Sequence, residues 1–90
     1  MLNPSFTDHF KNDFALLKDR GKDMGKLIEV FSMIVDKQPL LPKYETHPLE
    51  GDKQGKWECH IEPNWLVIYR IDEAKNNVIF YRTGNHSDLF

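Results

Sequence analysis

The last nine residues of the chain, from Arg82 to Phe90, combine three residue types that suit the cleavage of RNA. Arg82 ends an apolar stretch, a glycine turn follows, and then come His86 and the terminal Phe90. An arginine can bind a phosphate through two parallel hydrogen bonds, a histidine can transfer a proton near neutral pH, and an aromatic ring can stack on an unpaired base. Taken alone, this tail fits better an ordinary small domain that ends in a polar turn and a core-covering aromatic residue.

Two upstream histidines, His47 and His60, add the other groups that such cleavage needs. RNA provides its own nucleophile, the 2′-hydroxyl, so the protein must supply a base, an acid and charge stabilisation at the phosphate. His86 is the candidate acid, Arg82 the candidate phosphate ligand, and His47 and His60 are candidates for base and orienting roles. Each has a simpler alternative. His86 could be an ordinary surface histidine, and Arg82 could form a surface ion pair with a glutamate. His47 could be a loop residue without a role, and His60 could pair with a carboxylate on a neighbouring strand.

Aromatic and acidic neighbours extend this set. Trp65 and Phe90 are the candidates for base stacking, although Trp65 begins an apolar stretch and suits the core at least as well. Glu58 and Glu62 alternate with His60, which places them on the same face of an expected strand. Either carboxylate could tune the protonation of that histidine, although a solvated strand face is the commoner arrangement.

The first half of the chain predicts a hairpin of two amphipathic helices. Thr7 and Asp23 suit helix N-caps, Gly21 suits the end of the first helix, and Pro39 and Pro42 end the second. Apolar residues recur at helical spacing, namely Phe10, Phe14 and Leu17 in the first helix and Leu27, Ile28, Phe31, Ile34 and Val35 in the second.

The second half predicts three antiparallel strands, at 57–62, 65–71 and 78–83. The middle stretch is nearly all apolar and is expected in the centre of the sheet. Residues 2–6 predict a short edge strand because they contain Pro4, and the polar residues 44–55 predict a loop. The predicted fold class is therefore α+β, with the N-terminal helical hairpin packed on a small, mainly antiparallel sheet.

Length and composition limit the class of protein. Ninety residues, 40% of them hydrophobic, predict a single domain over residues 1–90 with one modest core. No signal peptide or membrane-length apolar run is apparent, so we expect a soluble, cytoplasmic protein that does not contact a membrane. The formal net charge of −2 argues against a protein that binds naked nucleic acid through a large basic surface.

The metal-ligating residue types do not occur at the usual spacings. One cysteine excludes an internal disulfide and a cysteine-rich zinc site. The four histidines include no H-x-x-x-H pair. We therefore expect neither a metal nor another cofactor.

Short motifs accompany the candidate residues in a fixed order: His47-Pro48-Leu49 with Gly51, His60-Ile61-Glu62-Pro63, Trp65 before a strand, and Arg82-Thr83-Gly84 with His86 and Phe90. In this order they resemble the YafQ branch of the RelE/ParE toxin superfamily. Lys22-Asp23-Met24 and Pro39-Leu40-Leu41-Pro42 fit as well, so the resemblance covers nearly the whole chain. The family consists of toxins of bacterial toxin–antitoxin pairs, described as ribosome-dependent endoribonucleases that cut mRNA in the decoding site.

The resemblance implies a RelE-like fold and an mRNA interferase activity in the ribosomal A site, leaving a 2′,3′-cyclic or 3′-phosphate end. It implies catalytic roles for His86, Arg82, His60 and His47, and substrate contacts by Trp65, Phe90 and Asn64. The expected partners are a cognate antitoxin and the ribosome with bound mRNA, with operator DNA contacted only through the antitoxin.

Asn64 departs from the family pattern, which has an aspartate before this tryptophan. An amide keeps the shape of a carboxylate and suits a turn, but it carries no charge to hold a histidine protonated. The acidic charge balance is a second departure, because RelE-type toxins are usually basic. The sequence leaves open an active enzyme without this carboxylate, a catalytically attenuated antitoxin-binding homologue, a deliberate substitution, and a ParE-like gyrase inhibitor without nuclease activity.

Overall fold

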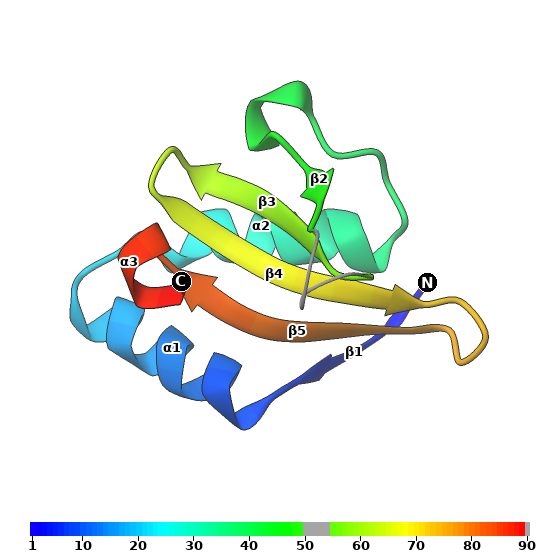
Figure 1. Cartoon of the computed structure of the whole chain (residues 1–90), viewed down its shortest axis with the longest axis horizontal. Helices are drawn as coiled ribbons and strands as arrows, with labels where there is room; N and C mark the ends of the chain where they lie inside the picture. Colours follow the sequence, from blue (N-terminus) through cyan, green and yellow to red (C-terminus); the bar gives the residue numbers. More distant parts are fainter. Residues whose placement is uncertain (50–54, 90) are drawn as a thin grey trace.

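The computed structural model describes residues 1–49 and 55–89 and contains a five-stranded mixed sheet in the order β1-β5-β4-β3-β2 (Figure 1). β1 (Asn3–Phe6) runs parallel to β5 (Asn77–Gly84), whereas β2 (His47–Pro48), β3 (Trp57–Glu62), β4 (Trp65–Asp72) and β5 pair antiparallel. The helical elements are α1 (Asp8–Asp19), α2 (Met24–Val35), the 3₁₀ turn η1 (Pro42–Tyr44) and α3 (His86–Leu89). The α+β class and the mainly antiparallel sheet are confirmed.

Both predicted helix caps are present. The Oγ1 atom of Thr7 accepts a hydrogen bond from the amide of Phe10 at 3.0 Å and donates one to the carbonyl of Tyr81 at 2.8 Å. The second bond ties the start of α1 to β5. At α2, a carboxylate oxygen of Asp23 accepts from the amide of Gly25 at 3.1 Å. The caps thus satisfy amide groups that the first turn of each helix leaves without partners.

The buried face of α2 differs by one position from the predicted stripe. Leu27, Val30 and Ile34 are buried, whereas Ile28 is 53% exposed. Residues at i, i+3 and i+7 lie on one side of a helix. Ile28 follows Leu27 directly, so its side chain points about 100° around the helix axis from that of Leu27. The prediction for Ile28 was wrong, and Val30 takes its place in the core.

β4 lies in the middle of the sheet and is buried on both faces. Trp65, Val67 and Tyr69 face α1 and α2 and join the main core, which includes Phe10, Leu27 and Phe80. Leu66 and Ile68 face the other side, where they pack with Leu89 of α3. We call this second side the open face, because α1 and α2 cover the opposite one (Figure 1).

The strand register aligns four residues in one row across the open face. His47 pairs with Glu58, Glu58 with Ile68, and Ile68 with Arg82. The last pairing depends on a register shift, because the next pair along β4 and β5 is Tyr69 with Phe80, which leaves Tyr81 without a partner. Paired residues in a sheet point to the same side, so the irregularity brings Arg82 onto the open face.

Three short elements were not predicted. η1 begins at the proline expected to end the second helix, β2 lies within the stretch expected as a loop, and α3 follows the last strand in the polar tail. None is long enough to show a periodic pattern of apolar residues. Among the described residues, no helix has the length and apolar character needed to cross a membrane.

Candidate functional site

Three of the predicted residues, His47, His60 and His86, meet around the side chain of Glu58 on the open face. The Nε2 atom of His47 lies 3.1 Å from Oε2 of Glu58. The Nε2 atoms of His60 and His86 lie 4.0 Å and 3.7 Å from its Oε1 atom. The imidazole rings are neighbours, with centroids 6.1 Å apart for His47 and His60 and 6.1 Å apart for His60 and His86. The fold therefore assembles histidines from β2, β3 and α3.

Glu58 is buried, with 4% of its surface exposed, rather than lying on a solvated strand face. Its Oε1 atom has no hydrogen-bond partner among the described residues. A buried carboxylate is costly unless charged or hydrogen-bonding groups compensate for the lost water. From the sequence, Glu58 was only one of two acids able to tune His60. Its burial between β2 and β4 makes it the centre of the site.

The two sheet histidines have their rings oriented by backbone carbonyl groups. Nδ1 of His47 lies 3.3 Å from the carbonyl oxygen of Pro48, and Nδ1 of His60 lies 3.4 Å from that of Pro63. A carbonyl oxygen can only accept, so these contacts place a hydrogen on Nδ1 of each ring. The Nε2 atoms, which face Glu58, are then left with a lone pair when the rings are neutral.

Arg82 is held by Asp13 of α1 and not by a glutamate of the sheet. Its Nε and Nη2 atoms donate to the two carboxylate oxygens at 2.7 and 3.1 Å, and the amide of Thr83 donates to the same carboxylate at 3.2 Å. The hydrogen bond to Asp13 raises the pKa of Arg82 above its ordinary value. The guanidinium is thus charged and fixed, with its other N–H groups left for a further ligand.

The three predicted substrate-binding residues do not all lie beside the histidines. Trp65 is 1% exposed and donates from Nε1 to Oγ1 of Thr83 at 3.0 Å, so its ring belongs to the main core and is not presented to a base. Asn64 is exposed in the turn between β3 and β4. Phe90 lies outside the described residues.

Glu62 does not share the face of His60, contrary to the strict alternation of the predicted strand. The pairing of β3 with β4 shifts between these two residues, and Glu62 forms ion pairs with Lys22 at 3.5 Å and Lys26 at 2.8 Å. The hydrogen bond from Lys26 lowers the pKa of Glu62 below its ordinary value. Glu62 is therefore engaged with the helical side of the molecule.

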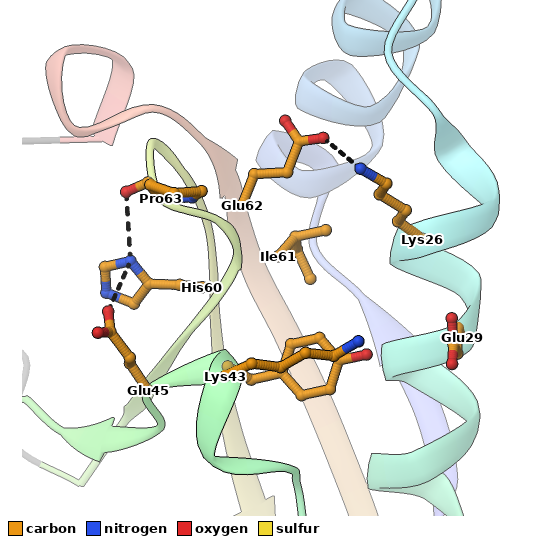
Figure 2. Close-up of a pocket in the computed structure, with 9 residues that line it drawn as sticks. Lys26, Glu29, Lys43, Glu45, His60, Ile61, Glu62 and Pro63 are labelled. Atoms are coloured by element: carbon orange, nitrogen blue, oxygen red, sulfur yellow. Dashed lines mark hydrogen bonds and ion pairs between the residues drawn. The ribbon is translucent and has the colours of Figure 1, made fainter.

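A cleft of about 530 Å³ opens beside His60, between α2, η1 and the end of β3 (Figure 2). Figure 2 shows the ring of His60 with Glu45 below it and Pro63 above it. The Nδ1 atom of His60 is 3.9 Å from a carboxylate oxygen of Glu45. The cleft walls include the side chains Lys26, Glu29, Lys43, Tyr44 and Glu62.

The cluster of histidines around Glu58 contains residue types that bind metals. One atom each from His47, Glu58 and His60 lie within 4.8 Å of one another. Two imidazoles and a carboxylate are a donor set that suits zinc and copper. The residues at the site therefore fit a transition-metal ion, although their separation in sequence did not predict one.

The chain is similar to several known bacterial toxins. The family described as "Bacterial toxin of type II toxin-antitoxin system, YafQ" matches residues 2–90. The mRNA interferase toxin YafQ of Escherichia coli K12 is 34% identical over 86 residues, covering 94% of this chain and 91% of that protein. The crystal structure of a metal-bound toxin from Helicobacter pylori is 37% identical with a TM-score of 0.95, and each chain is covered fully. The matching chain in the crystal structure of the E. coli DinJ–YafQ complex is 32% identical to this chain, with a TM-score of 0.91. The match covers 100% of this chain and 99% of the chain in the complex. The chain therefore belongs to the YafQ family of bacterial toxins of type II toxin–antitoxin systems.

Proposed function

We propose that this chain is an endoribonuclease that cuts mRNA bound in the ribosomal A site by acid–base chemistry. The observation that carries the proposal is the meeting of three imidazoles around the buried Glu58, in the same sheet row as Arg82. The E. coli relative named an mRNA interferase toxin supports the substrate class.

His47 acts as the general base and His86 as the general acid. His47 takes the proton of the 2′-hydroxyl, the 2′-oxygen forms a bond to phosphorus, and the bond from phosphorus to the 5′-oxygen breaks. His86 gives its proton to that departing oxygen, which leaves a 2′,3′-cyclic phosphate that water can open to a 3′-phosphate. The side chain of His47 is 50% exposed and that of His60 only 14%, so His47 is the more accessible base and His60 orients the cluster.

Glu58 stabilises the charged forms of the histidines during this cycle. When His47 accepts a proton on Nε2, the resulting cation lies 3.1 Å from the carboxylate. The same carboxylate is 3.7 Å from His86, which must carry a proton before it acts as an acid. One buried negative charge thus supports both proton-carrying states.

Arg82 stabilises the phosphate as negative charge develops on its oxygens. Two of its five N–H groups bind Asp13, which fixes the plane of the guanidinium and leaves the others for the phosphate. A fixed donor needs no reorganisation in the transition state, which is where such groups contribute most.

A cognate antitoxin and the ribosome are the proposed partners. The E. coli DinJ–YafQ complex supports an antitoxin partner for this chain, and we propose that operator DNA is contacted only through it. The ribosome delivers the mRNA and orients it against the histidines. Because translating ribosomes are cytoplasmic, we propose that the protein acts in the cytoplasm.

Primer extension on a defined mRNA tests the proposal directly. The purified chain is added to the message with and without translating ribosomes, and the ends are mapped. We expect new 5′ ends only when ribosomes are present, and the upstream fragment, analysed separately, should end in a cyclic or 3′-phosphate. The absence of cleavage under both conditions, with the chain folded by circular dichroism, contradicts the nuclease assignment. A supercoiling assay with gyrase on the same sample then tests the gyrase-inhibiting alternative.

A further inference from the structure

The open face carries a half-buried aromatic ring next to the histidine cluster. Tyr81 packs against the apolar residues of this face, which are Leu66, Ile68 and Leu89. It directly precedes Arg82, the proposed phosphate ligand. The ring that the sequence offered for base stacking, that of Trp65, is buried in the main core. Tyr81 presents a ring on the open face instead.

A β-bulge sets the position of Tyr81. The register shift between β4 and β5 makes this residue the extra one of the bulge, so it has no partner on β4. Its carbonyl oxygen nevertheless accepts a hydrogen bond from Oγ1 of Thr7 at 2.8 Å. Bulges turn side chains in new directions and are frequent beside active sites. The ring is thus held on the open face before any ligand binds.

Lys56 reaches the same ring from the far side of β4. Its Nζ atom lies 4.0 Å from the centroid of the Tyr81 ring. Lys56 directly precedes β3, and β4 lies between β3 and β5, so the two side chains meet across β4 (Figure 1). The carbonyl oxygen of Lys56 accepts a hydrogen bond from the amide of Leu49 at 2.9 Å, which fixes the backbone at this position. An ammonium group stays hydrated, so the ring face that it covers can be reached from solvent.

Arg70 adds a second cation on this face. Side chains alternate along a strand, and Leu66 and Ile68 face the open side, so Arg70 lies on the open face as well. Arg70 is exposed. The next residue of β4 on this face, Asp72, accepts a hydrogen bond from the backbone amide of Lys75 within the following turn. The open face therefore combines two cations with an aromatic ring, which is the combination that binds single-stranded RNA.

We propose that Tyr81, Lys56 and Arg70 form a binding subsite for the nucleotide next to the cleaved bond. The base stacks on the ring of Tyr81 and replaces the ammonium group of Lys56, which moves with Arg70 to the adjoining phosphate. Because every base has a π face, the subsite positions the RNA without reading its sequence. The subsite rests on the proposed function, since it takes its ligand from the RNA that the histidines cleave.

The subsite gives the substrate a second point of attachment. Arg82 holds the phosphate that is attacked, and the stacked base fixes the neighbouring nucleotide. Two attachments restrict the rotation of the sugar and phosphate between them, which favours the geometry for attack by the 2′-hydroxyl. Two cations and one ring bind free RNA only weakly, so the ribosome still has to deliver the message.

Rates of cleavage on ribosomes that hold a defined message test the role of the ring. Tyr81→Leu keeps an apolar side chain against the cluster but removes the ring, whereas Tyr81→Phe keeps the ring. We expect kcat/KM to fall about 5- to 150-fold in Tyr81→Leu, which corresponds to the 1–3 kcal/mol of one stacked base, and to change less than about twofold in Tyr81→Phe. Full activity of a folded Tyr81→Leu overturns the proposal.

A double variant tests the two cations. Lys56→Gln with Arg70→Gln should lower kcat/KM about 4- to 25-fold, as expected when two exposed ionic contacts are lost. Lys11→Gln with Lys18→Gln is the matched control, because it removes the same charge from exposed positions on α1, and it should leave cleavage unchanged. Equal losses in the two double variants would show an effect of net charge alone and would overturn the assignment of Lys56 and Arg70.

Messages with an abasic nucleotide on either side of the cleaved bond separate stacking from a structural role. At one of these positions the missing base should cost the original chain as much as Tyr81→Leu does. The same message should cost Tyr81→Leu less than about twofold more, because the stacking contact is already lost. Equal losses in both chains, or no loss at either position in the original chain, overturn the subsite while the nuclease function stands. The second criterion decides if Tyr81→Leu does not fold. Absence of cleavage by the folded original chain contradicts the proposed function and the subsite with it.

Discussion

At the residue scale, the environment of Glu58 is the main reason to place the candidate site on the open face. A carboxylate with 4% exposure is retained in a small protein only when its surroundings compensate for lost hydration. Here the surroundings are imidazoles, which change charge near neutral pH and are not permanent cations. A lysine or arginine beside Glu58 would form an ion pair whose charges do not change. With histidines as neighbours, the interaction energy of Glu58 changes whenever a histidine gains or loses a proton.

Replacement of His86 by alanine tests the general acid. We expect ribosome-dependent cleavage to fall about 10²- to 10⁴-fold, because one positioned proton donor typically contributes that much. The side chain is 56% exposed, so folding should be little affected. His9→Ala, an exposed change on α1, is the control and should leave cleavage unchanged. Equal and small effects in the two variants would contradict the role of His86.

Arg82→Lys tests whether the planar guanidinium is needed. Lysine keeps a positive charge but cannot bind Asp13 through two parallel hydrogen bonds and also present donors to a phosphate. We expect a loss of cleavage of at least about tenfold with little loss of antitoxin binding. Circular dichroism and thermal unfolding must show a folded variant. Cleavage at the original rate would reduce Arg82 to a structural partner of α1.

Asn64→Asp tests whether the missing carboxylate limits activity. Asn64 is exposed in the turn between β3 and β4, so the change should be tolerated because both residues suit turns. A negative charge in the turn that follows the strand of His60 would favour a protonated histidine at the site, and we expect faster ribosome-dependent cleavage. The rates of the two folded proteins on the same translated message decide the question. No increase would show that Asn64 is simply a turn residue and that the enzyme works without an acid here.

The sequence predicted the identity of the three site histidines but not the buried carboxylate between them. His47, His60 and His86 lie in recognisable motifs, whereas the sequence alone does not distinguish Glu58 from Glu62 on the expected polar strand face. Glu58 lies between β2 and β4 and also contacts His86 of α3, which is far from β3 along the chain. Likewise, the partner of Arg82 could not be predicted, because Asp13 belongs to a helix far away in sequence.

At the scale of elements, strong periodic patterns of apolar residues were sufficient to predict the bounds of strands, and weak patterns were not. The bounds of β3 were predicted in full and those of β4 and β5 to within a residue, because their apolar residues alternate or run continuously. β2 has two residues and carries no periodic signal. The register shift at Tyr81 is also invisible in a pattern of apolar residues, yet it places Arg82 in the row of the site.

Thiol labelling measures how firmly β3 is held beneath the site. Cys59 is fully buried next to Glu58, and burial raises the pKa of its thiol to about 12 from 9.0. Because only the thiolate reacts, a pKa higher by about three units lowers the reactive fraction at pH 8 by about 1,000-fold. We expect iodoacetamide to label the native chain at least about 100-fold more slowly than the chain unfolded in urea. Similar rates would show that β3 opens readily and that the site is not preorganised.

At the scale of the whole molecule, part of the positive charge of the described residues is paired with acids. The formal net charge is −2, and several cations are paired with acids on the surface, namely Arg20 with Asp88, Lys22 and Lys26 with Glu62, and Lys37 with Glu73. Such pairs add little to stability when exposed, but they leave less charge for a phosphate backbone. This charge balance agrees with the proposed function, in which the ribosome delivers the RNA.

We therefore expect weak binding to free RNA with a shallow dependence on salt. Each phosphate neutralised on a single strand contributes a slope of about −0.7 to the logarithm of affinity against the logarithm of salt concentration. Fluorescence anisotropy with a labelled single-stranded RNA should give a dissociation constant above about 100 μM at physiological salt and a slope no steeper than about −2. His86→Ala is used as a non-cleaving form, and the original chain at low temperature is its control. Submicromolar affinity with a steep slope would reveal a concentrated basic surface, and the ribosome would then not be needed to deliver the substrate.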